Sequence, residues 1–283
     1  MAAAEQRTNR HSAAPSTQVY WDSAAETYDH DFTETLIGQT RREAVWRKLD
    51  RSFHPGQRVL ELNCGTGIDA LHLAERGVRV IACDISRRMV ELAREHAGAS
   101  RFDAAVDFRV LPTEQIAALS SEGPFDGVFS NFAGLNCVED LGAVARDLQH
   151  LLRRGAPVLL CMLGRFVPWE IMWFLAHGRP RRAFERLGRG SARAVDGGIL
   201  KVRYPTVNQI ARAFEPGFRL RRWTGLGVTV PPSYMEHWAR RFPDVTRVFA
   251  SADRGLGMLP VLRSMADSVL LEFEHRGIVR AGA

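Results

Sequence analysis

Residues 58–84 constrain the fold of this chain more than any other part of the sequence. The segment opens with a short apolar run, which is typical of a parallel strand covered on both faces. Gly65 and Gly67 follow this run, and apolar side chains at helical spacing come next. A second apolar run then ends at Asp84. The order of strand, glycine turn, helix and strand predicts an open parallel sheet with its ligand at the carboxyl ends of the strands.

The glycine turn and the acid predict a pocket for an adenosine-bearing cofactor. Gly65 and Gly67 allow the backbone to approach a ligand and to turn into a helix whose free N–H groups favour a polar or anionic group. Asp84, at the end of the second strand, can accept hydrogen bonds from both hydroxyls of a ribose. The alternative is that the glycines only form a tight turn and that Asp84 only caps the helix beginning near Ser86.

The identity of the cofactor depends on Glu61. The run from Gly65 to Ala70 also satisfies the loose dinucleotide pattern G-x-G-x-x-G/A, which would indicate NAD. A carboxylate at Glu61, close to the phosphate site, would repel a pyrophosphate, whereas it suits a cationic sulfonium ligand. The alternative for Glu61 is a capping or solvated acid.

The order Glu61-Leu62-Asn63-Cys64-Gly65-Thr66-Gly67 resembles the first motif of the class I S-adenosylmethionine-dependent methyltransferases. The resemblance covers residues 19–163 and the last strand. It implies an α/β fold, with a Rossmann-like, mostly parallel sheet of seven strands, helices on both faces and a helical cap. It also implies S-adenosyl-L-methionine as the cofactor, with the ammonium group near Glu61, the methionine part along the loop that contains Asn63, and the ribose at Asp84.

The resemblance implies further cofactor contacts on the N-terminal helix and after the second strand. Tyr20 and Tyr28 lie on a helical segment similar to one that packs over the cofactor in this family, and the alternative is that both rings are core anchors. Ile85 and Met89 resemble the apolar pair that flanks the adenine. Both pairs would therefore enclose the cofactor from outside the glycine turn.

Contacts are also expected after the third and fourth strands. Pro112 stands where the family has an acid, so that Thr113, Glu114 or backbone groups would contact the adenine. Asn131 and Phe132 follow the fourth strand, where the family presents the methyl group, and the alternative for Asn131 is an Asx turn. The Asn/Asp-Pro-Pro-aromatic motif of methylases that act on amides and nucleic-acid bases is missing at this point. This argues against a nucleic-acid partner.

We expect a single methyltransferase domain at residues 19–283, preceded by a disordered tail at 1–18. The sheet core is expected at residues 50–163, 204–224 and 267–276. The cap is expected at residues 19–49, 164–203 and 225–266. The first insertion is rich in large apolar side chains that would line an acceptor pocket, with core packing as the alternative: Phe166, Trp169, Met172, Trp173 and Phe174.

The composition is that of a soluble protein. The net charge is +6 and 25% of the residues are charged. The four cysteines show no C-x-x-C spacing, so we expect reduced thiols in a cytoplasmic protein. No apolar run approaches the length of a membrane span. We expect no metal, and a homodimer remains open.

The sequence predicts methyl transfer from S-adenosylmethionine to a small, hydrophobic or aromatic molecule. Catalysis would come from proximity and orientation, since the methyl group is already activated. A general base is needed only for a hydroxyl or an acidic carbon, and His237 and His177 are the candidates, with a structural or exposed histidine as the alternative. Two other interpretations stay open. One is an NAD-dependent oxidoreductase, and the other is a catalytically inactive cofactor-binding module of the same fold.

Overall fold

The computed structural model describes residues 15–100, 102–188, 190–195 and 198–277. Most of the predicted disordered tail, residues 1–14, lies outside the described residues. Residues 15–18, however, belong to helix α1 (Pro15–Tyr28), so the tail was predicted to extend too far. The small polar side chains at this point suggested disorder, but Ser16 is only 6% exposed and takes part in packing.

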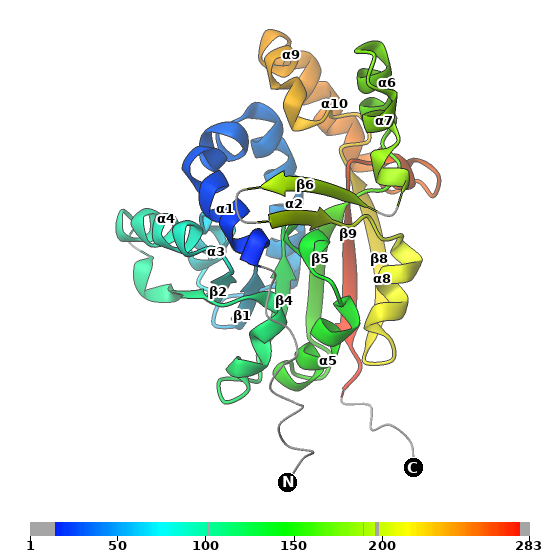
Figure 1. Ribbon diagram of the computed structural model, residues 1–283. Helices are drawn as coiled ribbons and strands as arrows, with labels where there is room; N and C mark the ends of the chain where they lie inside the picture. Colours follow the sequence, from blue (N-terminus) through cyan, green and yellow to red (C-terminus); the bar gives the residue numbers. More distant parts are fainter. Residues whose placement is uncertain (1–14, 101, 189, 196–197, 278–283) are drawn as a thin grey trace.

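Seven strands form one sheet, and the site lies at the carboxyl ends of its parallel strands. The strands are β1 (Arg58–Leu62), β2 (Arg79–Asp84), β3 (Val106–Val110), β4 (Gly127–Ser130), β5 (Pro157–Leu163), β8 (Phe218–Leu226) and β9 (Ser268–His275). Their order is β3-β2-β1-β4-β5-β9-β8 (Figure 1). β1 to β5 are parallel, and β9 runs antiparallel to both β5 and β8. The predicted seven-stranded, mostly parallel sheet is confirmed.

Helices cover both faces of the sheet because successive residues of each strand point to opposite sides. One face carries α2 (Leu36–Ser52), α3 (Ile68–Ala74) and α4 (Arg87–Gly98), and the other carries α5 (Leu141–Leu151) and α8 (Val207–Phe214). Val59 of β1 belongs to the core that contains Leu49 of α2. Its neighbour Leu60 belongs to the core that contains Leu148 of α5. Both residues are fully buried, as expected for a doubly covered strand.

The remaining elements gather beyond the carboxyl ends of the parallel strands (Figure 1). They are the π-helix η2 (Asp29–Thr33), α6 (Pro168–Ala176), α7 (Pro180–Ala183), the hairpin β6 (Ser191–Val195) and β7 (Gly198–Val202), α9 (Glu236–Arg241) and α10 (Pro243–Leu256). Short 3-10 helices complete the chain: η3 (Asp103–Ala105), η4 (Thr113–Leu119), η5 (Gly134–Cys137), η6 (Glu185–Leu187), η7 (Ser233–Met235) and η8 (Leu262–Met265).

The two insertions take different forms. The first, residues 164–203, folds into two helices and the hairpin, and both hairpin strands contact α1. The second begins after Leu226 rather than at residue 225, because β8 continues to that residue in its pairing with β9. No helix within the described residues is long and apolar enough to cross a membrane.

Candidate active site

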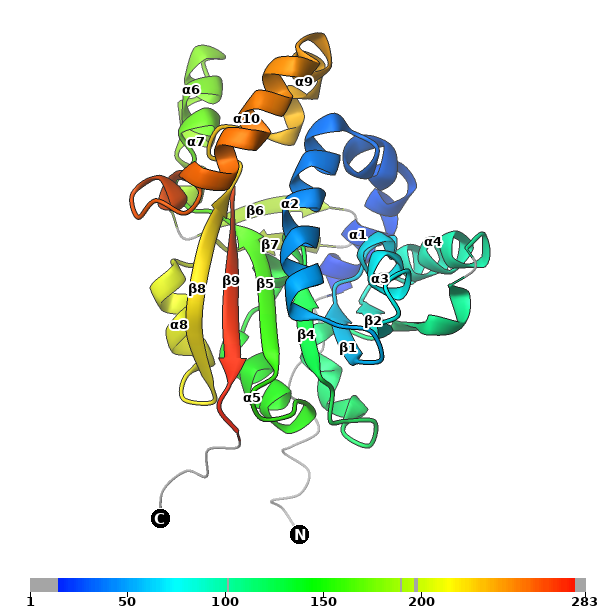
Figure 2. The same ribbon diagram turned by 180° about the vertical axis from the view of Figure 1, so that it is seen from behind.

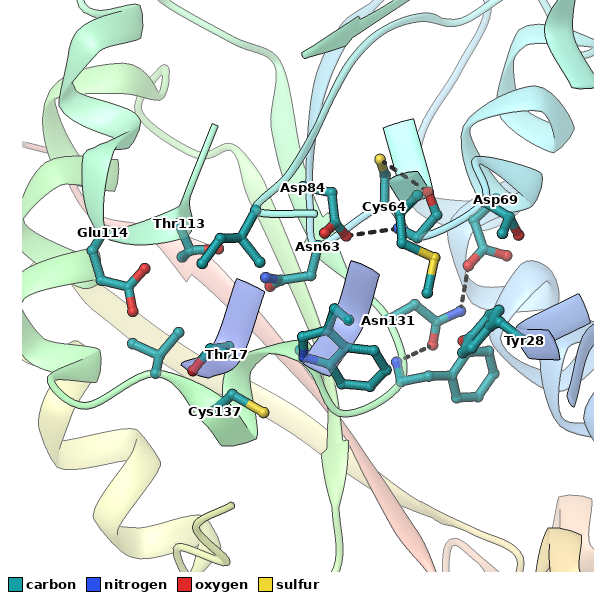
Figure 3. A pocket seen from close by; sticks show the side chains of 18 of the residues that line it. Thr17, Tyr28, Asn63, Cys64, Asp69, Asp84, Thr113, Glu114, Asn131 and Cys137 are labelled. Atoms are coloured by element: carbon teal, nitrogen blue, oxygen red, sulfur yellow. Dashed lines mark hydrogen bonds between the residues drawn. The ribbon is translucent and has the colours of Figure 1, made fainter. Parts of the chain in front are cut away.

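A cavity opens at the carboxyl ends of β1, β2 and β4, beside the glycine turn (Figure 3). We call it the cofactor cavity. Ten of the predicted site residues line it: Tyr28, Asn63, Gly65, Asp84, Ile85, Met89, Thr113, Glu114, Asn131 and Phe132. In Figure 3, Asp84 lies between Thr113 and Glu114 at one end and Tyr28 and Asp69 at the other. The cavity therefore has two ends with a carboxylate between them. This shape fits a nucleoside that carries a side chain, with the base at one end, the sugar at the carboxylate and the side chain at the other end.

Tyr20 does not line the cofactor cavity, which corrects its predicted place. On α1, Thr17, Trp21 and Tyr28 are spaced by four and seven residues and share the face toward this cavity. Tyr20 is one residue out of this register and lines the neighbouring cavity instead. The helical period thus places Trp21 and Tyr28 at the cofactor cavity, but not Tyr20.

Gly67 shapes the turn without lining the cavity. Its φ of +78° places it in the left-handed region at the start of α3. A Cβ at this position would come within 2.7 Å of the Phe108 ring and 2.8 Å of the Ala93 methyl group. A glycine is therefore needed here for backbone conformation and for close packing of α3 against its neighbours.

Three residues other than glycine adopt positive φ at this site. They are Asn63, at 58°, Phe132, at 44°, and Ala133, at 71°. Asn63 follows β1 and Phe132 follows the residue after β4, and both line the cofactor cavity. This conformation costs free energy and persists only where the surroundings impose it, and such residues cluster at ligand sites.

Asp84 fastens the glycine turn to the start of α4. Its two carboxylate oxygens accept hydrogen bonds from the backbone N–H of Gly65, at 2.9 Å, and of Ser86, at 2.8 Å. Burial raises the pKa of this carboxyl group to about 6, against the opposing effect of these hydrogen bonds. The hydroxyl of Ser86 caps α4 by accepting from Met89 N at 3.1 Å. Asp84 is thus not the capping side chain, and it borders the cavity.

Two charged residues that the sequence analysis missed, Arg42 and Asp69, line the same cavity. Asp69 Oδ1 lies 2.8 Å from Arg42 Nη1 and accepts from Trp46 Nε1 at 2.6 Å. Asp69 Oδ2 accepts from Asn131 Nδ2 at 2.8 Å, and Asn131 Oδ1 accepts from Phe132 N at 3.0 Å. This network holds Asn131 in place and links α2, α3 and the end of β4.

Arg42 is held between aromatic rings as well as by Asp69. Its guanidinium carbon lies 5.8 Å from the centre of the Phe32 ring and 5.3 Å from that of Phe132. Its Nε is buried and has no hydrogen-bond partner within the described residues. A buried arginine on the side of α2 that carries Val45 and Leu49 is a signal that the sequence contained, because a charge rarely occupies an apolar helix face without a partner.

Glu61 lies buried at the base of the site and does not line the cavity. Its side chain is 1% exposed, and Oε2 has no partner within the described part of the chain. Burial raises the pKa of Glu61 well above its usual value, and the charge of Asp69 raises it further. Among the described residues, the site thus holds three acids, Glu61, Asp69 and Asp84, against one lining cation, Arg42. A ligand that carries positive charge and hydroxyl donors fits this set.

The remaining cavity residues were also missed as contacts: Thr17, Trp21, Cys64, Thr66, Gly134, Cys137 and Val138. Thr66 Oγ1 donates to Asp29 Oδ1 at 2.8 Å, which ties the glycine turn to η2.

All four cysteines are free, as expected. Burial raises the pKa of the Cys137 thiol to about 11, so the thiol is neutral at neutral pH. The described residues contain no group of metal-ligating side chains.

A second cavity adjoins the first, and we call it the acceptor chamber. Trp21, Tyr28 and Phe132 line both. The chamber has further aromatic walls, formed by Tyr20, Phe32, Phe174, Tyr204 and Tyr234. The first insertion forms part of this wall, so that it covers the space next to the cofactor cavity.

Of the five apolar residues expected to line an acceptor pocket, only Phe174 lines the chamber. Met172 is 57% exposed and Phe166 is 39% exposed. The Trp173 ring packs against His177, with centroids 4.2 Å apart, and against Tyr234, at 5.8 Å. α6 is apolar around most of its surface, and only the side that carries Phe174 meets the chamber.

Arg186 holds the first insertion against the start of β9. It forms two hydrogen bonds with Glu170, of 3.0 and 2.7 Å, and one of 2.9 Å with Asp267 Oδ1. It also donates to the carbonyl oxygens of Gly164 and Asp267. Arg41 pairs with the other oxygen of Asp267. Four charged residues of the chamber wall, Arg41, Arg186, Glu170 and Asp267, are therefore neutralised against one another.

Neither predicted histidine lies at the chamber. His177 is exposed at the end of α6, where Nδ1 lies 2.8 Å from the Trp173 carbonyl oxygen. His237 is exposed on α9. Neither lines the cofactor cavity or the chamber, so the structure offers no role for them as a general base.

Comparison with known proteins finds methyltransferases. Residues 59–155 match the family model of a methyltransferase domain. The tRNA 5-carboxymethoxyuridine methyltransferase of Escherichia coli K12 is 31% identical over 162 residues, which are 56% of this chain and 57% of that protein. The demethylmenaquinone methyltransferase of Mycobacterium bovis is 29% identical over 234 residues, or 76% of this chain and 90% of that protein.

A solved structure agrees at the level of the fold. The CcbJ methyltransferase from Streptomyces caelestis has a TM-score of 0.59 and 17% identity, and the match covers 92% of this chain and 99% of that one. The segment matched by the family model, residues 59–155, contains the glycine turn, Asp84 and Asn131, and so most of the cofactor cavity. The matched domain, the relatives and the shared fold together support a class I S-adenosylmethionine-dependent methyltransferase, with S-adenosylmethionine as the cofactor.

Proposed function

We propose that this chain is an enzyme that transfers the methyl group of S-adenosylmethionine to a small molecule held in the acceptor chamber. The observation that carries the proposal is the wall formed by Trp21, Tyr28 and Phe132, which is common to both cavities. A methyl group presented at this wall would face the chamber. Donor and acceptor would therefore meet at the one place where the two spaces adjoin.

The cofactor would lie along the cavity in a defined direction. Ile85, Met89 and Thr113 would surround the adenine, and the Asp84 carboxylate would accept hydrogen bonds from the ribose hydroxyls. Arg42, at the other end, would bind the cofactor carboxylate, because it is the cation of the lining and its Nε lacks a partner within the described residues. The cofactor ammonium group would approach the buried carboxyl group of Glu61, lower its pKa and so favour its charged form.

When bound, the cofactor supplies a methyl group on a positively charged sulfur, which is already activated for transfer. The chain would contribute position and the exclusion of water. Tyr28 and Phe132, which line both cavities, would contact the acceptor and hold it next to the methyl group. Burial raises the pKa of Tyr28 to about 12, so its hydroxyl stays protonated at neutral pH and can donate a hydrogen bond.

The chamber wall favours a planar, apolar acceptor. Its rings present flat surfaces, while Arg186 is engaged by Glu170 and Asp267. The two relatives named above act on a modified tRNA uridine and on demethylmenaquinone, and the chain spans little more than half of the first, so they do not select an acceptor. The proposal of a small molecule rests on the covered chamber.

A labelling experiment tests this function. The protein would be incubated with methyl-deuterated S-adenosylmethionine and with separate small-molecule and RNA fractions of a bacterial extract. We expect labelled product in the small-molecule fraction and none with the Asp84→Ala variant. Label in the RNA fraction alone would contradict a small-molecule acceptor. Tight binding of S-adenosylhomocysteine with no product in either fraction would favour the inactive module.

A further inference from the structure

A third cavity lies apart from the cofactor cavity, between α2, β8 and the end of α10. We call it the basic cavity. Figure 2 shows α2 beside the central strands and α10 above the end of β8 on this face of the sheet. Six basic residues line the cavity: Arg41, Arg47, Lys48, Arg51, Arg222 and Arg254. It has no lining residue in common with the cofactor cavity, and Arg41 alone is common to it and the acceptor chamber.

The positive charge of the basic cavity is poorly compensated. No ion pair joins Arg47, Arg51 or Arg222 to an acid within the described residues, whereas Lys48 pairs with Glu272 at 2.7 Å. Burial lowers the pKa of Arg47, and the nearby charges of Arg254 and Arg51 lower it further, whereas the charge of Glu43 opposes them. An anion placed among these side chains would relieve their mutual repulsion.

The acid in the cavity wall does not balance these arginines. Asp253 Oδ2 accepts a hydrogen bond from Gly227 N at 2.6 Å. Its Oδ1 accepts from the backbone N–H and the hydroxyl of Thr229, at 2.7 and 2.9 Å. Both oxygens of Asp253 are thus committed to the loop that follows β8, which leaves the arginines available.

Two buried polar atoms of the cavity wall have no partner. Thr224 is 6% exposed, and its hydroxyl makes no hydrogen bond within the described residues. Arg41 is also 6% exposed, and the same holds for its Nε. Both residues line the basic cavity. Buried polar atoms are normally hydrogen-bonded, so two unpartnered atoms in one wall indicate a missing acceptor group.

The wall also has an apolar part, formed by Ala44, Leu226, Val230, Ala250 and Met258. An inorganic anion alone would leave this surface without a partner. A ligand that combines an anionic group with an apolar body would cover both parts. Of the anions common in cells, a phosphate group offers enough acceptor oxygens for several arginines and a hydroxyl at once.

We propose that the basic cavity binds a small phosphorylated molecule with an apolar body, at a site separate from methyl transfer. The phosphate contacts Arg47, Arg222 and Arg254 and accepts a hydrogen bond from the Thr224 hydroxyl. The apolar body packs against Leu226 and Met258. The site is reached without passing through the cofactor cavity.

Calorimetric titration of the full chain at low ionic strength tests this site, with phenyl phosphate, inorganic phosphate and phenol as probes. We expect phenyl phosphate to bind more tightly than inorganic phosphate and phenol not to bind. The double variant Arg47→Gln/Arg222→Gln should bind phenyl phosphate about tenfold more weakly. The matched control is Arg212→Gln/Arg219→Gln, which removes the same charge from exposed positions on α8 and β8 outside the cavity and should bind as the wild type does.

Thr224→Val separates a binding role from a structural one. The substitution removes a buried hydroxyl that has no partner, so the melting temperature without ligand should stay the same or rise. Binding of phenyl phosphate should nevertheless weaken severalfold. A site that is merely part of the packing would show the opposite pattern, with lower stability and unchanged binding.

Three results would overturn the proposal. The first is that neither phosphate probe binds the wild type. The second is that the control variant loses as much affinity as Arg47→Gln/Arg222→Gln. The third is that single-stranded RNA binds at the arginines while phenyl phosphate does not, which would assign the cavity to a nucleic-acid backbone.

Discussion

The guanidinium of Arg42 lies 2.8 Å from the carboxylate of Asp69, and both side chains line the cofactor cavity. The pair joins α2 to the first turn of α3, although 27 positions separate the two residues in the sequence. Asp69 also accepts a hydrogen bond from Asn131, so it fixes Arg42 on α2 and Asn131 after β4 at the same time. Its second role in our proposal is to fix Arg42 where the cofactor carboxylate would bind.

This role predicts a ligand-dependent effect of Arg42→Lys. Lysine keeps the charge but loses the planar fork that can bind Asp69 and a second carboxylate together. S-Adenosylhomocysteine should bind about tenfold to a hundredfold more weakly, by calorimetry. Methylthioadenosine, which lacks the carboxylate, should bind as it does to the wild type. An equal loss for both ligands would show that Arg42 only supports the fold.

Glu61 predicts a change in stability of known sign. Its pKa is raised in the folded protein, so the folded state binds more protons than the unfolded state, and stability falls as the pH rises above the usual value of 4.5. Glu61→Gln removes this penalty. Near neutral pH the free energy of unfolding without ligand should rise, and below pH 4.5 the difference should vanish.

Urea denaturation at both pH values measures this effect. Glu75→Gln is the control, since Glu75 is exposed on the surface next to α3 and should change neither value. The same Glu61→Gln variant should bind S-adenosylhomocysteine less tightly, because the ligand's ammonium group loses its buried counter-charge. A variant that is less stable near neutral pH would contradict the account of Glu61.

The acceptor chamber predicts different effects for two neighbouring residues of α6. Phe174 lines the chamber, whereas Met172 is 57% exposed. Once an acceptor is identified, Phe174→Ala should raise its KM about tenfold and leave the Kd of S-adenosylhomocysteine unchanged. Met172→Ala should change neither constant. If both variants behaved alike, the chamber would not be the acceptor site.

The sequence predicted the sheet and most of the cofactor cavity because both depend on local patterns. The glycine turn, the strand before it and Asp84 lie within one short segment, and the spacing of the residues fixes their places on adjacent strands. Asn131 and Phe132 were found in the same way, from the end of a strand. Such contacts follow from chain order and from the parallel sheet.

The rest of the site depends on contacts between distant segments. Arg42 and Asp69 meet only because α2 packs beside α3, and no local pattern indicates that meeting. Arg186, Glu170 and Asp267 form ion pairs although they come from three separate parts of the chain. Tyr20 and Trp21 are neighbours on α1, but successive side chains of a helix point about 100° apart, so Trp21 lines the cofactor cavity and Tyr20 does not. The hairpin of β6 and β7 was missed because β6 carries mostly small and charged residues.

Asp84 predicts a pH dependence of cofactor binding. Its pKa is raised to about 6, and the carboxylate form accepts hydrogen bonds from the ligand as well as from Gly65 and Ser86. The affinity for S-adenosylhomocysteine should therefore be constant above this value and fall below it, by at most about tenfold for each pH unit. Asp84→Asn should bind weakly with a flat profile. A wild-type affinity that stays constant through pH 6 would contradict this assignment.

The central claim is that the cavity at Asp84 binds S-adenosylmethionine, and titration calorimetry with S-adenosylhomocysteine tests it most directly. We expect the wild type to bind one equivalent and NAD to give no heat of binding. Asp84→Ala should bind S-adenosylhomocysteine more weakly by about 1.5 to 3 kcal/mol, the usual loss for hydrogen bonds to a charged group. Unchanged affinity in Asp84→Ala, or binding of NAD in place of S-adenosylhomocysteine, would contradict the account.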